Sequence, residues 1–413
     1  MTSADEQLRA KLALIFVPGL YACLLLSALI SVAIAAALIA LVAWIGYLTG
    51  YRMAGPVALL AIGGIAGIII SLRAGFKTIQ RARITVIGLP LQERDAPRLF
   101  KLLRRMSQAL NCDLPDHVIV ELDSNFFVTE AKVICIDRPR RGRTLVLSAP
   151  LLRLLSIKEL CAVLAHEMAH FSGADTAYSC RFYPIYRGTS SAIEDIERIF
   201  GSEREDSGIV AIPLLIPYFL LNWYLNFFAL REASISRARE LRADRLAAKI
   251  TSPRVMASAL IKVHAYCVLW SRAMDSWIIK YVETRKSVAN LSRLFCQSVS
   301  HEVKRESGRV IELARSCDIL WHPTDSHPSL DSRLTYLGET GSALALGDQQ
   351  TASQLVPSLD KFERELTEIK GHLTAQVVMA QAEASASKRV SLGWRLGRAI
   401  RRFLHRSPSG TSV

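Results

Sequence analysis

Three residues of this chain have the types and spacing needed to bind and use a metal ion. His166, Glu167 and His170 form an HExxH pattern within the apolar, helix-like run LLRLLSIKELCAVLAHEMAH. On a helix, a spacing of four puts both imidazoles on one face, within reach of one zinc ion, and turns Glu167 toward the open coordination position. About one chain in a hundred of this length contains the pattern by accident, so its surroundings must support it.

A hydrolytic zinc site needs three protein ligands and one water molecule. The ion lowers the pKa of that water to about 7, and a neighbouring carboxylate then takes its proton. We therefore expect one zinc ion per chain, with His166 and His170 as ligands and Glu167 as the general base.

A third ligand is expected from the Arg-rich, helix-like segment 236–244 (SRARELRAD). Glu240 and Asp244 lie one turn apart and share a face. Glu240 suits the third ligand position, and Asp244 suits an acceptor for the free N–H of a ligand histidine. Taken alone, ExxxD among arginines is more often a solvated face with salt bridges.

These residues must be positioned next to a membrane. Residues 16–48 contain no charge, and about 20 apolar residues already cross a bilayer core of about 30 Å. Arg52 follows in a short turn, and the apolar run 54–72 is rich in Gly and Ala, which let two helices approach closely. We expect a transmembrane helical hairpin. A cleaved signal peptide is the alternative, but the apolar run is too long for one.

Basic residues after the hairpin predict its orientation. The turn between the spans offers only Arg52, whereas four basic residues follow the second span: Arg73, Lys77, Arg81 and Arg83. Because cytoplasmic flanks carry the excess of Lys and Arg, we expect residue 73 onward in the cytoplasm. The predicted location is a membrane, the bacterial inner membrane, with the catalytic site facing the cytoplasm.

A third apolar stretch, residues 209–230, lies between the histidines and Glu240. A single full crossing would separate Glu240 from His166 and His170, and they could not share an ion. Asn222 and Asn226, at i, i+4 spacing, would also face protein or water rather than lipid. We therefore expect this stretch to dip into the membrane, lie along it, or pack within the protein.

The chain between the hairpin and the HExxH helix mixes a helix with short β-branched runs, which predicts an α+β, mainly helical domain. The run Thr144–Ser148 is expected to form an exposed edge strand. Leu145, Val146 and Leu147 would then hold an extended substrate peptide by main-chain pairing.

Composition argues against nucleic acid as a partner. The formal net charge of +14 comes from basic residues beside apolar stretches and in the C-terminal tail, and no nucleic-acid-binding motif accompanies them. Membrane lipid is the expected partner of this charge. The eight cysteines are scattered without a CxxC pair and are expected to be reduced thiols.

The basic tail is expected to bind membrane lipid as an amphipathic helix. Between residues 388 and 406 four apolar residues share one helical face: Leu392, Leu396, Ile400 and Phe403. A disordered basic tail is the alternative, because Gly393 and Gly397 weaken the helix.

Three segments together carry a family resemblance. RTLVLSAPLLRLLSIKELCAVLAHEMAHFSGADT, SRARELRADRLA and SHPSLDSRL occur in the order found in the HtpX-type membrane zinc metalloproteases, a family that also contains the CAAX prenyl protease. The match covers roughly residues 84–335, after the apolar hairpin. One apolar stretch separates the histidines from Glu240 where the family usually shows two, and the basic tail is not a family feature.

The resemblance implies a gluzincin-type fold and roles for the site residues. It implies zinc ligands at His166, His170 and Glu240, a catalytic Glu167, and Asp244 behind the ligands. It further implies that Asn125 belongs to an NxF-type motif before the edge strand and that His327 and Arg333 line the site. His327 would donate to the oxyanion formed on the scissile carbonyl; a surface loop histidine is the alternative.

The resemblance implies a zinc-dependent endopeptidase that cleaves membrane or membrane-proximal polypeptides, in protein quality control or regulated proteolysis. Prenyl-peptide cleavage, a protease that is latent until activated, and a catalytically silent membrane scaffold or chaperone are the alternatives. Three domains are expected: the hairpin (1–75), the metalloprotease domain (76–345, with 209–230 inserted), and a helical C-terminal extension with the basic tail (346–413).

Overall fold

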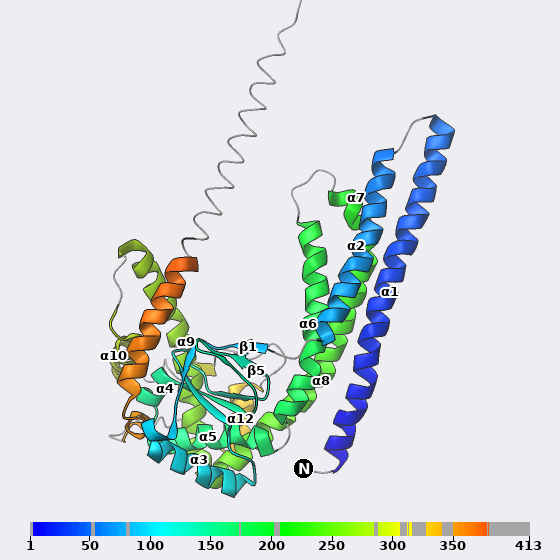
Figure 1. Cartoon of the computed structure of the whole chain (residues 1–413). Coiled ribbons are helices and arrows are strands. Elements are labelled where there is room, and N and C mark those ends of the chain that lie inside the picture. The colour runs from blue at the N-terminus through cyan, green and yellow to red at the C-terminus, as the bar shows by residue number, and fades with distance from the viewer. Residues whose placement is uncertain are drawn as a thin grey trace, which may run out of the picture.

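A bundle of long helices and an α+β domain lie side by side in this chain (Figure 1). The structure, a computed structural model, describes residues 3–50, 54–79, 83–172, 175–201, 207–284, 288–305, 312, 314–315, 328–340, 350–377 and 379. The chain passes from the bundle to the domain, back into the bundle, and then returns to the domain with the segment that carries Glu240.

The N-terminal hairpin consists of α1 (Ser3–Thr49) and α2 (Ala54–Ile79). Small residues let the two helices approach closely: a Cβ on Gly64 would come within 2.8 Å of the Ala35 Cβ. By length and composition, Phe16–Thr49 and Ala54–Thr78 are each able to cross a membrane. The predicted apolar helical hairpin is therefore confirmed.

A second pair of helices leaves the domain and returns to it. α6 (Asp175–Phe200) runs along α2, and α7 (Ser207–Ala211) and η2 (Ile212–Leu214) lead into α8 (Leu215–Ile250). The segment Gly208–Ile250 is also long and apolar enough to cross. α6 leads the chain from the domain into the bundle, and α8 leads it back to the domain. The apolar stretch therefore does not separate Glu240 from the histidines.

The domain contains two small sheets. One has the strand order β2 (Gly88–Pro90), β3 (His117–Glu121), β7 (Thr144–Ser148), β4 (Phe127–Thr129), with β3 and β7 parallel and the outer pairs antiparallel. The other has the order β1 (Arg83–Thr85), β5 (Lys132–Ile134), β6 (Pro139–Arg140).

The prediction that residues 144–148 form an edge strand is wrong. β7 is paired with β3 on one side and β4 on the other, and Leu145, Val146 and Leu147 are 0% exposed. An uninterrupted apolar run is typical of a strand covered on both faces, and here opposite faces of β7 enter two different hydrophobic clusters. The edge next to β7 is β4.

The helices that contribute buried residues to the main core include α3 (Pro97–Leu110), α4 (Ala149–Leu154), α5 (Ile157–Ser172), α9 (Pro253–Thr284), α10 (Leu291–Arg305), α12 (Leu330–Leu337) and η3 (Ala352–Leu355). The short helix η1 (Glu93–Asp95) precedes α3. The buried side of α3, one face of β3 and β7, and the apolar side of α5 meet in one cluster. The helix that carries His166 and His170 is therefore held at the centre of the domain.

Residues 350–377 belong to that same core. Thr351 forms a β-bridge with Ser156, directly before α5, and residues 359–377 are helical. Leu355, Leu359 and Leu366 are buried in the main cluster. A division at residue 346 therefore does not follow the packing. The predicted amphipathic tail lies outside the described residues.

Candidate metal centre

The metal-binding helix α5 begins with a capping box. The Glu159 amide donates to the Ser156 hydroxyl at 3.2 Å, and the Ser156 amide donates to Glu159 Oε2 at 2.9 Å. Two backbone donors that a helix start leaves unpaired are thus satisfied, and the first residue of the helix is fixed. The SxxE pattern of Ser156 and Glu159, before the apolar run, is the sequence signal for this start.

Glu159 also attaches α5 to α9. Its Oε1 atom lies 2.6 Å from Lys262 Nζ and accepts a hydrogen bond of 2.6 Å from the Ser258 hydroxyl. Glu159 and Lys262 are both buried, so their charges are paired inside the domain rather than in water. This contact between positions 103 residues apart has no local sequence signal.

His166 and His170 lie one turn apart on the buried side of α5. Their ring centroids are 5.0 Å apart and the rings are nearly perpendicular, and the residues are 6% and 8% exposed. Met168, between them, points into the core and is 0% exposed. The helix therefore turns both imidazoles toward the same small space.

Glu240 reaches that space from α8. Its two carboxylate oxygens lie 3.4 Å from His166 Nε2 and 3.5 Å from His170 Nε2, and the three possible ligand atoms all lie within 4.8 Å of one another. With bonds of about 2.1 Å, the ligand atoms of a tetrahedral zinc site lie about 3.4 Å apart. Two imidazoles and one carboxylate at this separation fit one divalent ion, with a position left for water.

Asp244, one turn beyond Glu240, contacts the ring nitrogen of His166 that does not face Glu240. Its Oδ1 atom lies 2.9 Å from His166 Nδ1, which leaves Nε2 facing Glu240. Arg333 then binds Asp244 through two hydrogen bonds, from Nε at 2.8 Å and Nη2 at 2.6 Å. Arg333 is carried by α12, which Ser329 caps at its start and Gly338 ends in the left-handed conformation.

The electrostatics of this cluster favour a cation. Burial by itself lowers the pKa of His166, but hydrogen bonds and charges from Asp244 and Glu240 outweigh it and raise the pKa to about 10. Burial raises the pKa of Asp244, yet Arg333 and His166 lower it to about 2, so Asp244 stays ionised. The field that stabilises a protonated imidazole also stabilises a bound metal ion.

Glu167 lies between the two histidines in sequence and is half-buried, whereas His166, Met168 and His170 are buried. It is close enough to the cluster for its charge to contribute to the raised pKa of Arg333. A carboxylate next to this cluster and partly open to solvent is suited to exchange protons with a water molecule.

The remaining predicted residues are placed as follows. Arg333 is 3% exposed and faces Asp244 and Glu240. Asn125 is half-buried, two residues before β4. Leu145, Val146 and Leu147 lie inside the sheet, and His327 lies outside the described residues.

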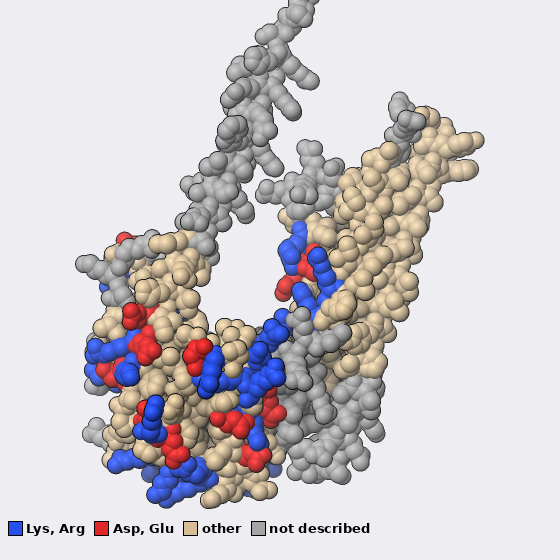
Figure 2. Space-filling view, viewed as in Figure 1, with Lys and Arg blue, Asp and Glu red and all other residues tan. Residues whose placement is uncertain are grey.

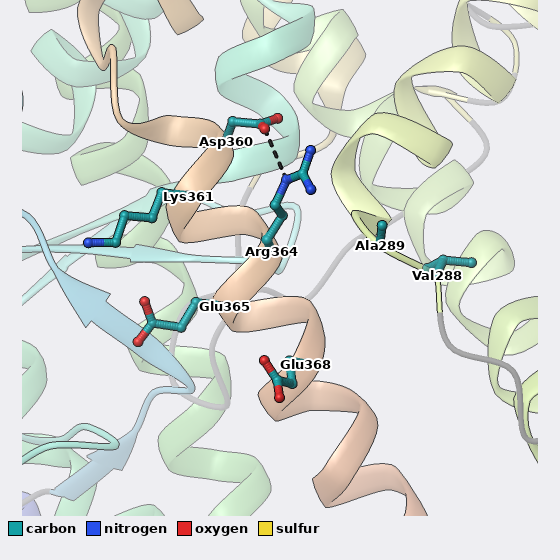
Figure 3. A pocket seen from close by; sticks show the side chains of 7 residues that line it. All are labelled: Val288, Ala289, Asp360, Lys361, Arg364, Glu365 and Glu368. Carbon is teal, nitrogen blue, oxygen red and sulfur yellow. Dashed lines mark hydrogen bonds and ion pairs between the residues drawn. The ribbon is translucent and has the colours of Figure 1, made fainter.

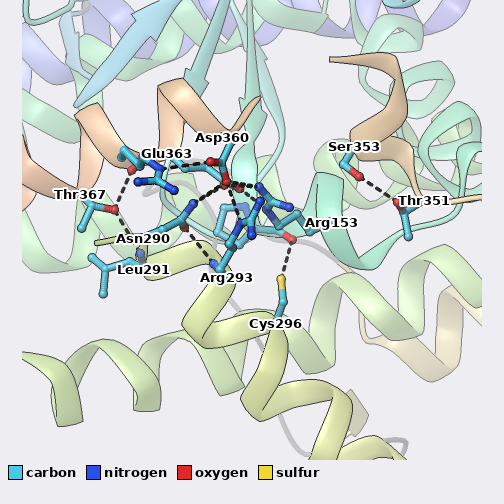
Figure 4. Close-up of polar contacts among 12 residues, drawn as sticks. Arg153, Asn290, Leu291, Arg293, Cys296, Thr351, Ser353, Asp360, Glu363 and Thr367 are labelled. Carbon is cyan, nitrogen blue, oxygen red and sulfur yellow. Dashed lines mark hydrogen bonds and ion pairs between the residues drawn. The ribbon is translucent and has the colours of Figure 1, made fainter. Parts of the chain in front are cut away.

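A polar network that was not predicted from the sequence attaches the helix formed by residues 359–377 to α4 (Figure 4). Glu363, 0% exposed, accepts hydrogen bonds from Arg153 Nε at 2.6 Å and Asn290 Nδ2 at 2.7 Å. Asp360 pairs with Arg153 at 3.1 Å and with Arg293 at 2.7 Å. Because α4 leads directly into α5, the network supports the helix that carries both histidines.

A hollow on the outer side of the helix formed by residues 359–377 has no set of possible ligands comparable to His166, His170 and Glu240. It measures about 780 Å³ and is lined by Val288, Ala289, Asp360, Lys361, Arg364, Glu365 and Glu368 (Figure 3). Asp360 and Arg364 form an ion pair at its wall, 3.1 Å long. Its lining includes neither histidine nor cysteine, so we assign the metal chemistry to the buried cluster.

Comparison with known proteins agrees with this geometry. Proteins named Protease HtpX homolog from Burkholderia thailandensis and Burkholderia mallei are each 32% identical over 179 residues, and one from Burkholderia multivorans is 31% identical over 184 residues. Each alignment covers 43% of this chain, and the chain spans 59% of the length of these relatives. No solved structure matches the chain.

The family comparison covers the whole site. The model of peptidase family M48 matches residues 93–340, which include α5, the Glu240 segment of α8, and α12. This range is more than half of the chain and contains the His166, His170 and Glu240 cluster. The chain therefore belongs to peptidase family M48.

Proposed function

We propose that this chain is a zinc-dependent membrane endopeptidase that cleaves membrane or membrane-proximal polypeptides. The observation that carries the proposal is that His166, His170 and Glu240 converge from two helices into one buried cluster. Their possible ligand atoms lie close enough together to bind one metal ion. Membership of a metallopeptidase family supports the metal, and the two histidines with one carboxylate favour zinc. The three apolar helices support attachment to a membrane.

The proposed reaction is hydrolysis by an activated water molecule. Bound zinc would polarise the scissile carbonyl and lower the pKa of a water molecule to about 7. Glu167 takes the proton from this water as it attacks, and then delivers the proton to the leaving nitrogen. Asp244 keeps His166 in the tautomer that turns Nε2 toward the ion, and Arg333 keeps Asp244 in place. No covalent enzyme intermediate is needed.

For substrate binding we propose the edge of β4 in place of β7. Among the described strands, β4 has a partner only on the β7 side, and it packs against α5. An extended peptide paired with Phe127–Thr129 would lie beside the metal-binding helix. Donation by His327 to the oxyanion remains a prediction, tested by the loss of turnover in His327→Ala.

We propose that the catalytic domain faces the cytoplasm of a bacterial inner membrane. Support comes from the basic residues Arg73, Lys77 and Arg83 after the second span, because such residues favour the cytoplasmic side. The basic tail is proposed to add lipid contacts. Deleting residues 388–413 should then weaken binding to vesicles that contain anionic lipid, and unchanged binding would show that the hairpin alone is responsible.

The deciding experiment compares detergent-solubilised wild type with Glu167→Gln on unfolded casein, with and without a zinc chelator. Zinc content is measured in parallel. We expect wild type to cleave casein, and we expect cleavage to be lost in Glu167→Gln although zinc is still bound. A wild type that binds zinc without cleaving would favour a latent protease or a scaffold, and a wild type without zinc would overturn the site.

A further inference from the structure

The depth of the α6–α8 hairpin can be measured against α2. The apolar part of α2, Ala54–Leu72, is about 28 Å long, which matches a bilayer core of about 30 Å. Arg52 precedes it and Arg73 follows it, so α2 marks both boundaries of the hydrocarbon region. α1 is too long to serve as such a marker, because its charge-free part exceeds the thickness of the core.

α7 and η2, which lead into α8, pack against α2 near the middle of this length. Pro213 Cγ lies only 3.1 Å from where a Cβ on Gly63 would sit, and Leu214 approaches Gly67. Gly63 lies about 14 Å from Ala54 along the axis of α2, which is about half the length of its apolar part. In Figure 1 the described ends of α1 and α2 extend beyond α7.

The outer face of α6 is charged along the part that runs beside α2. α6 passes α2 at Gly188, where a Cβ would lie 3.3 Å from the Ala74 carbonyl oxygen. Glu194, Glu197 and Arg198 are exposed, and they lie about 9 to 15 Å further along α6 toward its tip. The Arg198 side chain is 72% exposed although it pairs with Asp195.

These charges all lie on one side of the bundle. Figure 2 shows charged side chains on the side of the bundle that faces the catalytic domain, whereas the coloured surface of the α1–α2 hairpin in this view is uncharged toward its tip. α6 packs mainly against α2, α8 and α1, so its other face is not covered by these helices. Exposed carboxylates and a guanidinium do not face lipid tails, because neither their charges nor their hydrogen bonds would be satisfied there.

We propose that α6–α8 is a re-entrant hairpin. It enters the bilayer from the catalytic side, turns near the middle of the hydrocarbon region, and returns on the same side. The charged face of α6 contacts water and lipid headgroups drawn into an indentation that opens to the catalytic side. If the proposed protease function also holds, this indentation brings an aqueous surface next to α5, where a peptide leaving the bilayer meets the metal.

Cysteine labelling in the full-length protein tests the topology. Sealed vesicles of both orientations are treated with a membrane-impermeant maleimide, and the wild type provides the background from its native cysteines. That background is low for Cys112 and Cys296, because burial raises the pKa of Cys112 to about 11 and that of Cys296 to about 12. Variants are compared only if they retain the elution profile of the wild type.

Four single cysteine substitutions are compared: one reporter and three reference positions. Arg198→Cys reports the charged face, and Ile65→Cys, 56% exposed on α2 at a similar depth, is the lipid-facing control. Thr49→Cys marks the tip of the first hairpin, and Arg364→Cys, with a side chain 61% exposed on the domain, marks the catalytic side. The assay does not require cleavage, so its result is separate from that of the casein experiment.

We expect Arg198→Cys to be labelled from the same side as Arg364→Cys, at a rate within about tenfold of it. Thr49→Cys should be labelled from the opposite side only, and Ile65→Cys from neither side. Labelling of Arg198→Cys from the Thr49 side would mean that the hairpin crosses completely. No labelling of Arg198→Cys from either side would mean that lipid or a second copy of the chain covers the face. Either result overturns the proposal.

Discussion

At the scale of single residues, Asp244 determines how the metal centre is arranged. It is 0% exposed, holds His166 at 2.9 Å, and is itself held by two hydrogen bonds from Arg333. These contacts join α5, α8 and α12, whose residues are distant in sequence. A carboxylate behind a ligand histidine fixes the ring and makes it a stronger donor. Asp244 is therefore a positioning residue that does not need to touch the substrate.

Asp244→Asn should weaken zinc binding by about 10- to 100-fold, because an amide keeps the size of the side chain but removes the charge behind His166. The measurement is zinc retention during titration with a chelator. Asp331→Asn, with a side chain 64% exposed, is the control and should match the wild type. Equal zinc retention in both variants would show that the Asp244 charge does not support the ligand.

Glu121 is predicted to make stability depend on pH. Burial, with Asp123 adding to it and Lys370 opposing it, raises the pKa of Glu121 from 4.5 to about 8. Between these values the unfolded chain has released this proton while the folded chain still binds it. The stabilising contribution is therefore complete below pH 4.5 and is lost as the pH rises toward about 8.

Glu121→Gln should remove this contribution to the pH dependence. We expect the variant to lose less thermal stability than the wild type between pH 5 and pH 8, as measured by melting in detergent at several pH values. Glu93→Gln, at an exposed side chain, provides the control and should follow the wild type. Parallel curves for Glu121→Gln and the wild type would mean that Glu121 is ionised in the folded protein at all these pH values.

At the scale of elements, helices were predictable and strand neighbours were not. The charge-free runs and the HExxH run specify helices by their own composition and spacing. The run TLVLS specifies a strand, but whether that strand is central or at an edge depends on β3 and β4, which are paired with it from elsewhere in the sequence. The edge position was therefore assigned to the wrong strand, although the three candidate metal ligands lie together as expected.

The contact between α5 and α9 gives a prediction at this scale. Lys262→Met should lower the free energy of unfolding by about 3 kcal/mol, because it leaves Glu159 buried without its opposite charge. Lys249→Met, at an exposed position of α8, should change it by less than about 0.5 kcal/mol. Thermal unfolding in detergent compares the two. Similar small effects would mean that the buried pair does not hold α5.

At the scale of the whole molecule, the sequence predicted the segments but not which of them form one unit. Residues beyond 346 were expected to be a separate helical extension. Its partners, Arg153 and Asn290, lie 210 and 73 residues away from Glu363, and no local pattern identifies such pairs. The family match also ends at residue 340, before this helix. The structure nevertheless places the helix in the core that supports α5.

Ending the chain at two positions tests whether this helix is part of the catalytic unit. A chain that ends after residue 345 loses the buried Leu359 and Leu366, the β-bridge of Thr351 to Ser156, and both carboxylates that pair with Arg153. Apolar surface of α4 and α5 is then exposed, and the half-buried guanidinium of Arg153 loses two partners. Both changes destabilise the domain.

A chain that ends after residue 379 keeps all of these contacts and loses residues 380–413, which include the basic tail. We expect the longer chain to bind zinc and to melt within a few degrees of the full-length protein, and the shorter chain to lose zinc and unfold at a clearly lower temperature. If the shorter chain instead retained both properties, Arg153 and the start of α5 would be stable without the helix. The M48 match alone would then define the catalytic unit, and the network around Glu363 would be a peripheral attachment.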